Sequence, residues 1–209
     1  MLQQIIRSLC ISKTGEKACK NNNGYTLVEL ITVIAIISIM MGGVSYGVNL
    51  VFSKDAVKCA THLNDAVFEA RSVAMTKPGD YLLKVSQASG VYDAQIIEKT
   101  ESGESLYQDM PLDDKKTIAK IEFAFDQDSA FTGDVKDSPI YISFDKSKGN
   151  ITGIGTNINV TKIKDSVAPG ESGYTDGVIT FTVTQKKGNK PPQDVTIITA
   201  TGKHFVGDR

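Results

Sequence analysis

The feature that most constrains this chain is a long apolar run near its N-terminus. Between Glu29 and Lys54 the sequence contains no charged residue, and most side chains from Leu30 to Phe52 are apolar. A run of about 20 residues can cross the hydrocarbon of a bilayer as a helix. The apolar part of a cleaved secretory signal is shorter, about 7–15 residues, and ends at a small-residue cleavage site that is not evident here. The sequence therefore predicts a retained membrane-spanning helix.

Charges before the run predict its orientation. Glu16 is the one acid before Gly24. The basic residues of the same segment are Arg7, Lys13, Lys17 and Lys20. By the positive-inside rule this segment stays in the cytoplasm and the bulk of the chain is exported. We therefore expect a single-pass protein with its N-terminus inside and a head outside.

Glu29 lies at the start of the apolar run, where a carboxylate is unfavourable. An ionised acid near the bilayer centre costs about 2.5–3.5 kcal/mol on insertion scales, and less near the interface. The positions three and four residues later are Thr32 and Val33, so no basic partner lies on the same helix face. Acids in such places usually have a function, which predicts that a partner for Glu29 comes from another molecule.

The stretch Gly24-Tyr25-Thr26-Leu27-Val28-Glu29-Leu30, followed by an apolar helix, resembles the class III signal of type IV pilins and type II secretion pseudopilins. The resemblance implies that a prepilin peptidase cuts after Gly24 and that the new N-terminal residue, Tyr25, is methylated. It also implies that Glu29, fifth in the mature chain, pairs with the N-terminal ammonium of a neighbouring subunit during assembly. Two departures from the family are Tyr25, where Phe is usual, and the absence of the helix proline of many major pilins.

The residues after Phe52 change to an amphipathic pattern and then to a β pattern. One helical stripe is formed by Ala56, Ala60, Leu63, Val67, Ala70 and Ala74. Pro78-Gly79 ends this helix, and alternating apolar residues follow, as in Ile121, Phe123 and Phe125. We therefore expect an α+β fold, in which a long N-terminal helical spine, membrane-spanning in its first half, packs on a C-terminal antiparallel β-sheet head.

This pattern divides the chain into four expected parts. They are a cytoplasmic leader (1–24), a transmembrane and assembly helix (25–52), an amphipathic helix packed on the head (53–77) and a β-rich head (78–209). Turn residues predict three hairpins in the head: Tyr81–Val85 with Val91–Ile97, Ile140–Phe144 with Ile151–Ile154, and Val178–Thr184 with Val195–Ala200. Ala66–Val85 and Val195–Gly207 also resemble the minor pseudopilins of H type.

Candidate sites for other chemistry are sparse, and we expect neither an enzyme nor a cofactor. His62 and His204 lie far apart in sequence, and no serine nucleophile motif accompanies them. The cysteines, Cys10, Cys19 and Cys59, lack the spacing of a zinc site. The acidic segment with Asp126, Asp128 and Asp134 departs from EF-hand spacing, so we expect a solvated loop there and leave a calcium site as the weaker alternative.

The composition and the resemblance together define the expected partners. A net charge of −1 without a basic stripe does not indicate nucleic acid. The resemblance implies prepilin peptidase, other pilin or pseudopilin subunits, an inner-membrane assembly platform, and membrane lipid before assembly. The expected location is the bacterial cytoplasmic membrane and then a periplasmic or extracellular filament. The alternative is an unprocessed single-pass adaptor or sensor with an extracytoplasmic β-rich domain.

Overall fold

The computed structural model describes residues 26–52, 54–113, 116–164, 172–187 and 191–208, without the side chains of residues 42–52 and 130. The chain divides into two compact units, Met1–Ser45 and Tyr46–Arg209. Helix α1 (Leu27–Phe52) contains the apolar run. Among the described residues, no helix meets the combined length and apolarity needed to cross a membrane. The predicted membrane span remains a prediction from the sequence.

Helix α2 (Asp55–Thr76) has the amphipathic face predicted from the sequence. All six residues of the predicted apolar stripe are buried, and Cys59, Ala66 and Val73 are buried with them. The helix ends because Lys77 is extended, with φ −102° and ψ 143°, as expected for a residue that precedes a proline. The prediction of a helix with one buried face in this segment is confirmed.

The larger sheet has seven strands in the order β3-β2-β1-β6-β7-β8-β9. Its strands are β1 (Asp80–Ala88), β2 (Val91–Thr100), β3 (Gly103–Pro111), β6 (Ile140–Phe144), β7 (Ile151–Gly155), β8 (Thr161–Lys164) and β9 (Tyr174–Thr175). Neighbours in this sheet are antiparallel except for β8 and β9, which are parallel. Strand β3 forms one edge, and its side chains are mostly exposed.

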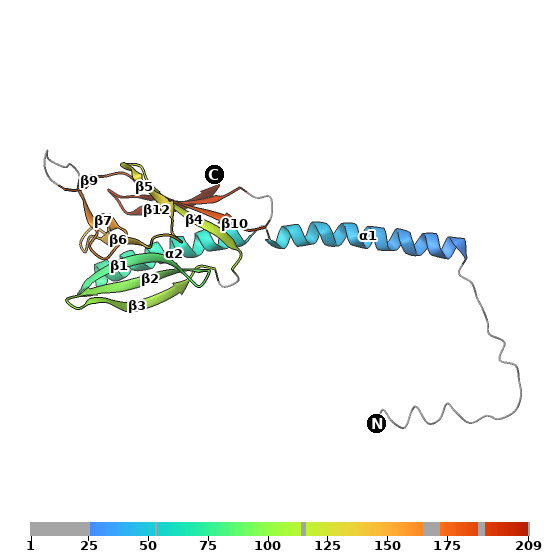
Figure 1. Ribbon diagram of the computed structural model, residues 1–209, viewed down its shortest axis with the longest axis horizontal. Helices are drawn as coiled ribbons and strands as arrows, with labels where there is room; N and C mark the ends of the chain where they lie inside the picture. Colours follow the sequence, from blue (N-terminus) through green and yellow to red (C-terminus); the bar gives the residue numbers. More distant parts are fainter. Residues whose placement is uncertain (1–25, 53, 114–115, 165–171, 188–190, 209) are drawn as a thin grey trace, which may run out of the picture. The chain divides into compact units, whose positions relative to one another are not determined.

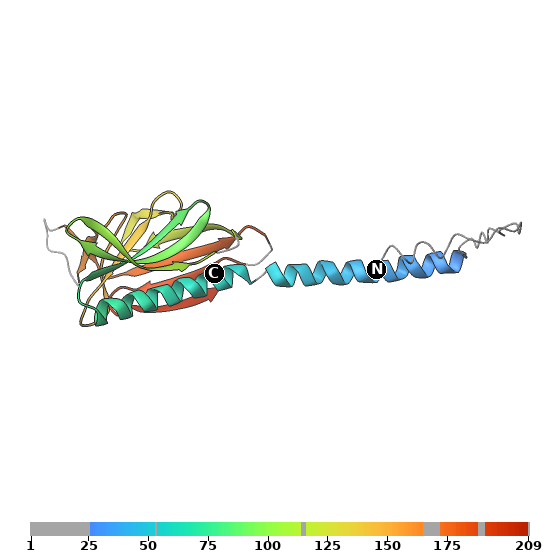
Figure 2. The same ribbon diagram turned by 90° about the horizontal axis from the view of Figure 1, so that it is seen from below.

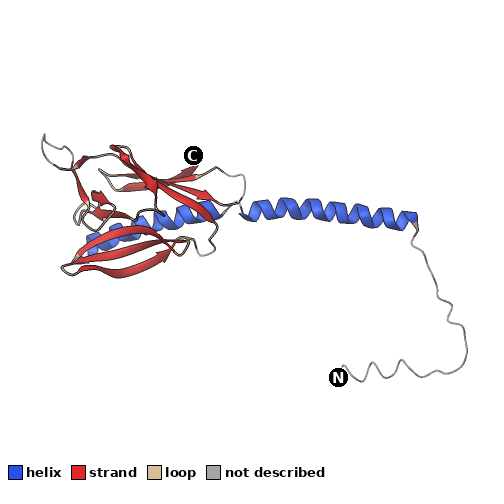
Figure 3. Cartoon of the chain, in the orientation of Figure 1, coloured by secondary structure: helices blue, strands red, loops and turns tan. Residues whose placement is uncertain are grey.

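The smaller sheet has five strands in the order β12-β11-β10-β4-β5. Its strands are β4 (Ile118–Phe125), β5 (Asp128–Asp134), β10 (Val178–Gln185), β11 (Gln193–Ile198) and β12 (Lys203–Asp208). All pairings in it are antiparallel. The α+β class is therefore confirmed, and Figure 3 shows how strands make up the body of the head.

The three predicted hairpins are all present, as β1–β2, β6–β7 and β10–β11. The expectation of a solvated loop for the acidic segment is wrong, because most of it forms the edge strand β5, paired with β4. The physical reason is aromatic packing. The ring of Phe131 lies 5.0 Å from that of Phe123 in an edge-to-face contact, which favours holding this segment against the sheet.

Helix α2 contacts strands of both sheets, and the core forms where these elements meet. In Figure 1 it lies between the β1–β3 strands and the β10–β12 strands, and Figure 2 shows it running along one side of the head. Leu63 from α2, Leu83 from β1 and Phe181 from β10 are each 0% exposed. Among the residues whose side chains are described, every member of this core lies between Ala56 and Val206, so a fragment that begins at Lys54 contains all of them.

The C-terminal half of α2 is tied to a turn from each sheet. Arg71 donates hydrogen bonds to the carbonyls of Gly202, in the β11–β12 turn, and Lys148, in the β6–β7 turn, at 3.3 and 3.4 Å. The N–H of Ile151 donates to the carbonyl of Thr199 at 3.0 Å, which joins the two turns directly. This junction holds α2 and both sheets together at one end of the head.

Candidate functional site

The first turn of α1 is organised by Thr26. The backbone N–H of Glu29 donates to Thr26 Oγ1 at 3.2 Å, and the N–H of Leu30 donates to the Thr26 carbonyl at 3.1 Å. Thr26 is thus the N-cap, and Thr26-Leu27-Val28-Glu29 has the S/T-x-x-E spacing of a capping box. The sequence analysis missed this role, although the spacing alone could have revealed it.

Glu29 lies in this first turn and its side chain is exposed. A carboxylate there interacts favourably with the positive end of the helix dipole, typically by about 0.3–1 kcal/mol. That gain is smaller than the insertion cost of about 2.5–3.5 kcal/mol for an acid at the bilayer centre. The local effect therefore does not by itself account for an acid at the edge of an apolar run.

Over residues 27–41, the part of α1 whose side chains the structure describes, large apolar side chains are exposed on every side of the helix. Its exposed large hydrophobic residues are Leu27, Val28, Leu30, Ile31, Val33, Ile34, Ile36, Ile37, Ile39, Met40 and Met41. Thr32 and Ser38 turn their hydroxyls back onto the helix carbonyls of Glu29 and Ile34, at 2.9 and 2.8 Å. A helix that is apolar all round is stable only when buried, in protein or in lipid.

Residues 19–45 match the family model for the prokaryotic N-terminal methylation motif. The match contains the predicted cleavage position, the N-cap Thr26 and the acid Glu29. It supports a type IV pilin-like family and indicates processing and methylation of the prepilin kind. No curated protein and no solved structure matches the chain.

The predicted processing residues, Gly24 and Tyr25, lie outside the described residues. Cleavage after Gly24, methylation of Tyr25 and pairing of Glu29 with a neighbour remain predictions. The capped first turn is compatible with them, because the described helix begins at Leu27, two residues after the expected new N-terminus.

The three acids of the possible calcium site are spread along the β4–β5 hairpin. Each accepts a hydrogen bond from the protein: Asp126 from the N–H of Val178 at 2.7 Å, Asp128 from the Tyr174 hydroxyl at 2.9 Å, and Asp134 from the N–H of Lys136 at 2.9 Å. Within the described ranges, no group of three or more His, Cys, Asp or Glu side chains is placed to hold a metal ion. Calcium binding here stays a hypothesis from the sequence.

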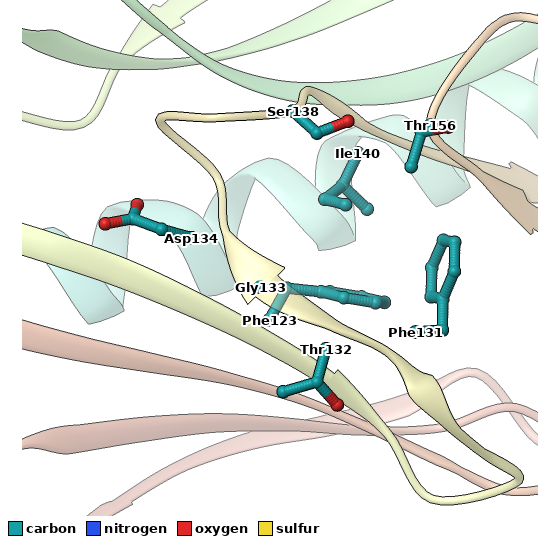
Figure 4. Close-up of a pocket in the computed structure, with 8 residues that line it drawn as sticks. All are labelled: Phe123, Phe131, Thr132, Gly133, Asp134, Ser138, Ile140 and Thr156. Atoms are coloured by element: carbon teal, nitrogen blue, oxygen red, sulfur yellow. The ribbon is translucent and has the colours of Figure 1, made fainter.

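A small cavity opens between β4, β5 and the start of β6, with a volume of about 90 Å³. Phe123, Phe131 and Ile140 form its apolar walls, and in Figure 4 the carboxylate of Asp134 points away from Phe131. Ligand pockets usually have about 300–1,000 Å³, so this cavity has room for a methyl-rich side chain rather than for a metabolite.

The histidines and the described cysteine occupy ordinary positions. His62 is exposed on α2, and the ring of His204, on β12, lies 6.3 Å from that of Phe68. Cys59 is buried in the core, where burial and, to a lesser degree, the charge of Asp113 raise the pKa of its thiol to about 12. A thiol with such a pKa stays protonated near neutral pH and is a poor nucleophile. Cys10 and Cys19 lie outside the described residues.

The sequence analysis also missed Asp113, a buried carboxylate at the start of the smaller sheet. It accepts hydrogen bonds from the N–H of Thr117 at 3.0 Å, the hydroxyl of Thr117 at 3.0 Å and the N–H of Ile118 at 2.8 Å. These bonds compensate the burial of the carboxyl oxygens and hold Asp113 against the start of β4. Its role is structural.

Proposed function

We propose that this protein is a structural subunit of a type IV pilus or a type II secretion-like filament. Prepilin peptidase would remove residues 1–24, and the chain would then assemble through its N-terminal helix with other pilin-like subunits at an inner-membrane platform. The observation that supports this most strongly is the methylation motif at residues 19–45, which includes the first part of α1, where large apolar side chains are exposed on every side over residues 27–41. The proposal gives the chain no enzymatic activity.

The apolar helix has two successive environments in this proposal. Before assembly it lies in the cytoplasmic membrane with the head outside, as the positive charges of the leader predict. After assembly other subunits cover it. Glu29 is unfavourable in the first environment and gains a partner in the second, the amine of Tyr25 from a neighbour, because an unpaired charge in an apolar place is penalised.

The minor H-type subclass is a finer proposal, supported by the resemblance of Ala66–Val85 and Val195–Gly207. In the structure these stretches form the end of α2 with the start of β1, and β11 with its turn and β12. Helix-to-hairpin junctions of this kind occur on many folds, so an isolated likeness is weak support. Copy number of the protein in sheared filaments would test whether the subunit is minor.

The proposal is tested by the intact mass of the membrane-extracted protein. A chain that starts at Tyr25 with one added methyl group supports it, and a chain that starts at Met1 supports the unprocessed anchor instead. Gly24→Ala is the matched variant, since a side chain at this position should crowd the bond to be cut. Normal trimming of Gly24→Ala would contradict the assignment.

A further inference from the structure

The two sheets of the head have four edge strands, and two of them are tied to each other by side chains. The Tyr174 hydroxyl of β9 donates to Asp128 of β5 at 2.9 Å, and the Tyr174 ring lies 5.2 Å from that of Phe125 in an edge-to-face contact. The other two edges are β3 and β12, and among the described residues no strand pairs with their outer sides. Outside the two helices, the exposed large apolar side chains of the described residues all lie on these two strands: Leu106, Tyr107 and Phe205.

Strand β3 carries features that protect an edge from pairing. A bulge makes Tyr107 an extra residue opposite β2. The strand ends at Pro111, and its charged residues, Glu104 and Asp109, are both acids, so that two such strands side by side would repel each other. Bulges, prolines and charges are devices by which natural sheets keep their edges apart.

Strand β12 has neither a bulge nor a proline. Its six residues pair with β11 in an unbroken register, and its two ends carry charges of opposite sign, Lys203 and Asp208. Phe205 is 53% exposed, and nothing lies within 4 Å of the place where Gly207 would carry a Cβ. Side chains two positions apart on a strand point to the same face of the sheet. This edge therefore presents a projecting ring and an open gap on one face.

We propose that β12 pairs with β12 of a second copy of this chain, antiparallel and about a two-fold axis at Val206. In this register Phe205 lies opposite Gly207 of the second copy. An aromatic ring over a cross-strand glycine fills the gap left by the missing side chain, and the symmetry makes this contact twice. His204 lies opposite Asp208 of the second copy, so no like charges face each other within the paired segment. Because the strand is complementary to itself, a second copy fits it better than an unrelated partner does.

Strand β12 runs antiparallel to α2. Gln185, at the end of β10, contacts the first turn of α2, whereas Gly202, just before β12, contacts Arg71 in the C-terminal half of α2. Strands β10 and β12 point the same way, since each is antiparallel to β11. The two copies of α2 in the proposed pair therefore run in opposite directions.

This direction determines where such a pair could form, and here the inference rests on the proposed function. Subunits repeated along one filament all point the same way, so the pair would join heads that belong to two filaments running in opposite directions. Five residues of strand pairing make a small contact, but many such contacts act together along two filaments. The β12 edge would thus promote bundling of filaments.

The test uses the fragment Lys54–Arg209, with its fold checked by circular dichroism and its self-association measured by sedimentation. Phe205→Lys removes the ring and adds a charge at the proposed contact. The matched control, Leu106→Lys, makes the same kind of change on β3, where the side chain is 58% exposed. Val206→Cys tests the register, because opposite Cα atoms of an antiparallel pair lie about 4.5–5.5 Å apart, within the range that a disulfide bridges. The other cysteine of the fragment, Cys59, is buried.

We expect the fragment to form dimers and Val206→Cys to oxidise to disulfide-linked dimers. Phe205→Lys should weaken dimerisation about tenfold, because each dimer loses two ring contacts, and Leu106→Lys should leave it unchanged. A fragment that stays monomeric at its highest soluble concentration, or equal losses in the two lysine variants, would overturn the proposal. Association that only Leu106→Lys abolishes would assign the pairing to β3 and would also overturn it.

In filaments, electron microscopy should show bundles for the parent and separate filaments for Phe205→Lys. Equal bundling of the two would refute the role of β12 between filaments. Retention of Met1 in the full chain would overturn the proposed function, whereas the fragment experiments alone decide whether β12 pairs with itself.

Discussion

Gly202 is the position where a single added methyl group should be most informative about the head. Its φ is +63°, a left-handed conformation that glycine adopts easily. A Cβ there would overlap the carbonyl oxygen of Gly149 and would lie 3.4 Å from Cζ of Arg71. Gly202→Ala thus forces apart the junction of α2 with the β6–β7 and β11–β12 turns.

The expected loss of stability has two parts that a control separates. Alanine at positive φ costs about 1–2 kcal/mol. Overpacking in a place that cannot relax freely adds about 1–3 kcal/mol. Gly90 has φ +81° and open space around its missing Cβ, so Gly90→Ala should show the first part alone. We expect a decrease in the free energy of unfolding of about 2–5 kcal/mol for Gly202→Ala and about 1–2 kcal/mol for Gly90→Ala.

The assay is urea unfolding of the fragment Lys54–Arg209, followed by circular dichroism because the chain contains 0 Trp. The linear dependence of the free energy on urea gives the difference between variants when the slopes agree. Equal losses for Gly202→Ala and Gly90→Ala would refute the reasoning, since they would mean that the contact with Gly149 is not tight.

Three further predictions concern the helix, the larger sheet and the head as a whole. Glu29→Val should keep or raise the amount of the protein in the membrane but lower the number of filaments, because the charge that meets the neighbouring amine is lost. Thr26→Ala, which weakens the helix cap by about 1 kcal/mol, should leave the number of filaments unchanged. An equal loss of filaments in both variants would mean that capping, and not charge, is what matters. The hydrogen bond from Lys84 lowers the pKa of the Glu104 carboxyl. The ionised Glu104 carboxylate therefore stabilises the fold at pH values above the usual carboxyl pKa, and this stabilisation is lost as the pH falls through the lowered pKa. Urea midpoints of Glu104→Gln should therefore fall less with acid than those of the parent, and a parallel fall would contradict this. The fragment Lys54–Arg209 should give a mainly β circular-dichroism spectrum with a helical minority, and a helix-dominated spectrum would contradict the fold.

Local patterns predicted the parts of the fold that depend on near neighbours in sequence. The stripe of α2 follows from helical periodicity, and the three hairpins follow from alternation interrupted by turn residues. The order of the strands did not follow, because it depends on pairings such as Phe123 with Phe181, which join distant segments. Many registers satisfy the same alternation, and packing against α2 selects among them.

At the candidate site, too, the features that depend on adjacent residues could be predicted and those that depend on the fold could not. The motif around Glu29 was visible in the sequence because it is a run of adjacent residues, and the family model matches it. The N-cap role of Thr26 depends on the same adjacent residues, through the S/T-x-x-E spacing from Thr26 to Glu29. The buried Asp113 was not predictable, since its role depends on the turn that brings it onto Thr117 and Ile118.

Whether the chain is a processed filament subunit can be read from the state of the protein in sheared filaments. Filaments from wild-type cells and membranes from cells without prepilin peptidase would be compared by intact mass. We expect a methylated chain that starts at Tyr25 in the filaments and a chain that keeps residues 1–24 in the peptidase-deficient membranes. A protein absent from filaments, with Met1 retained in wild-type membranes, would contradict it.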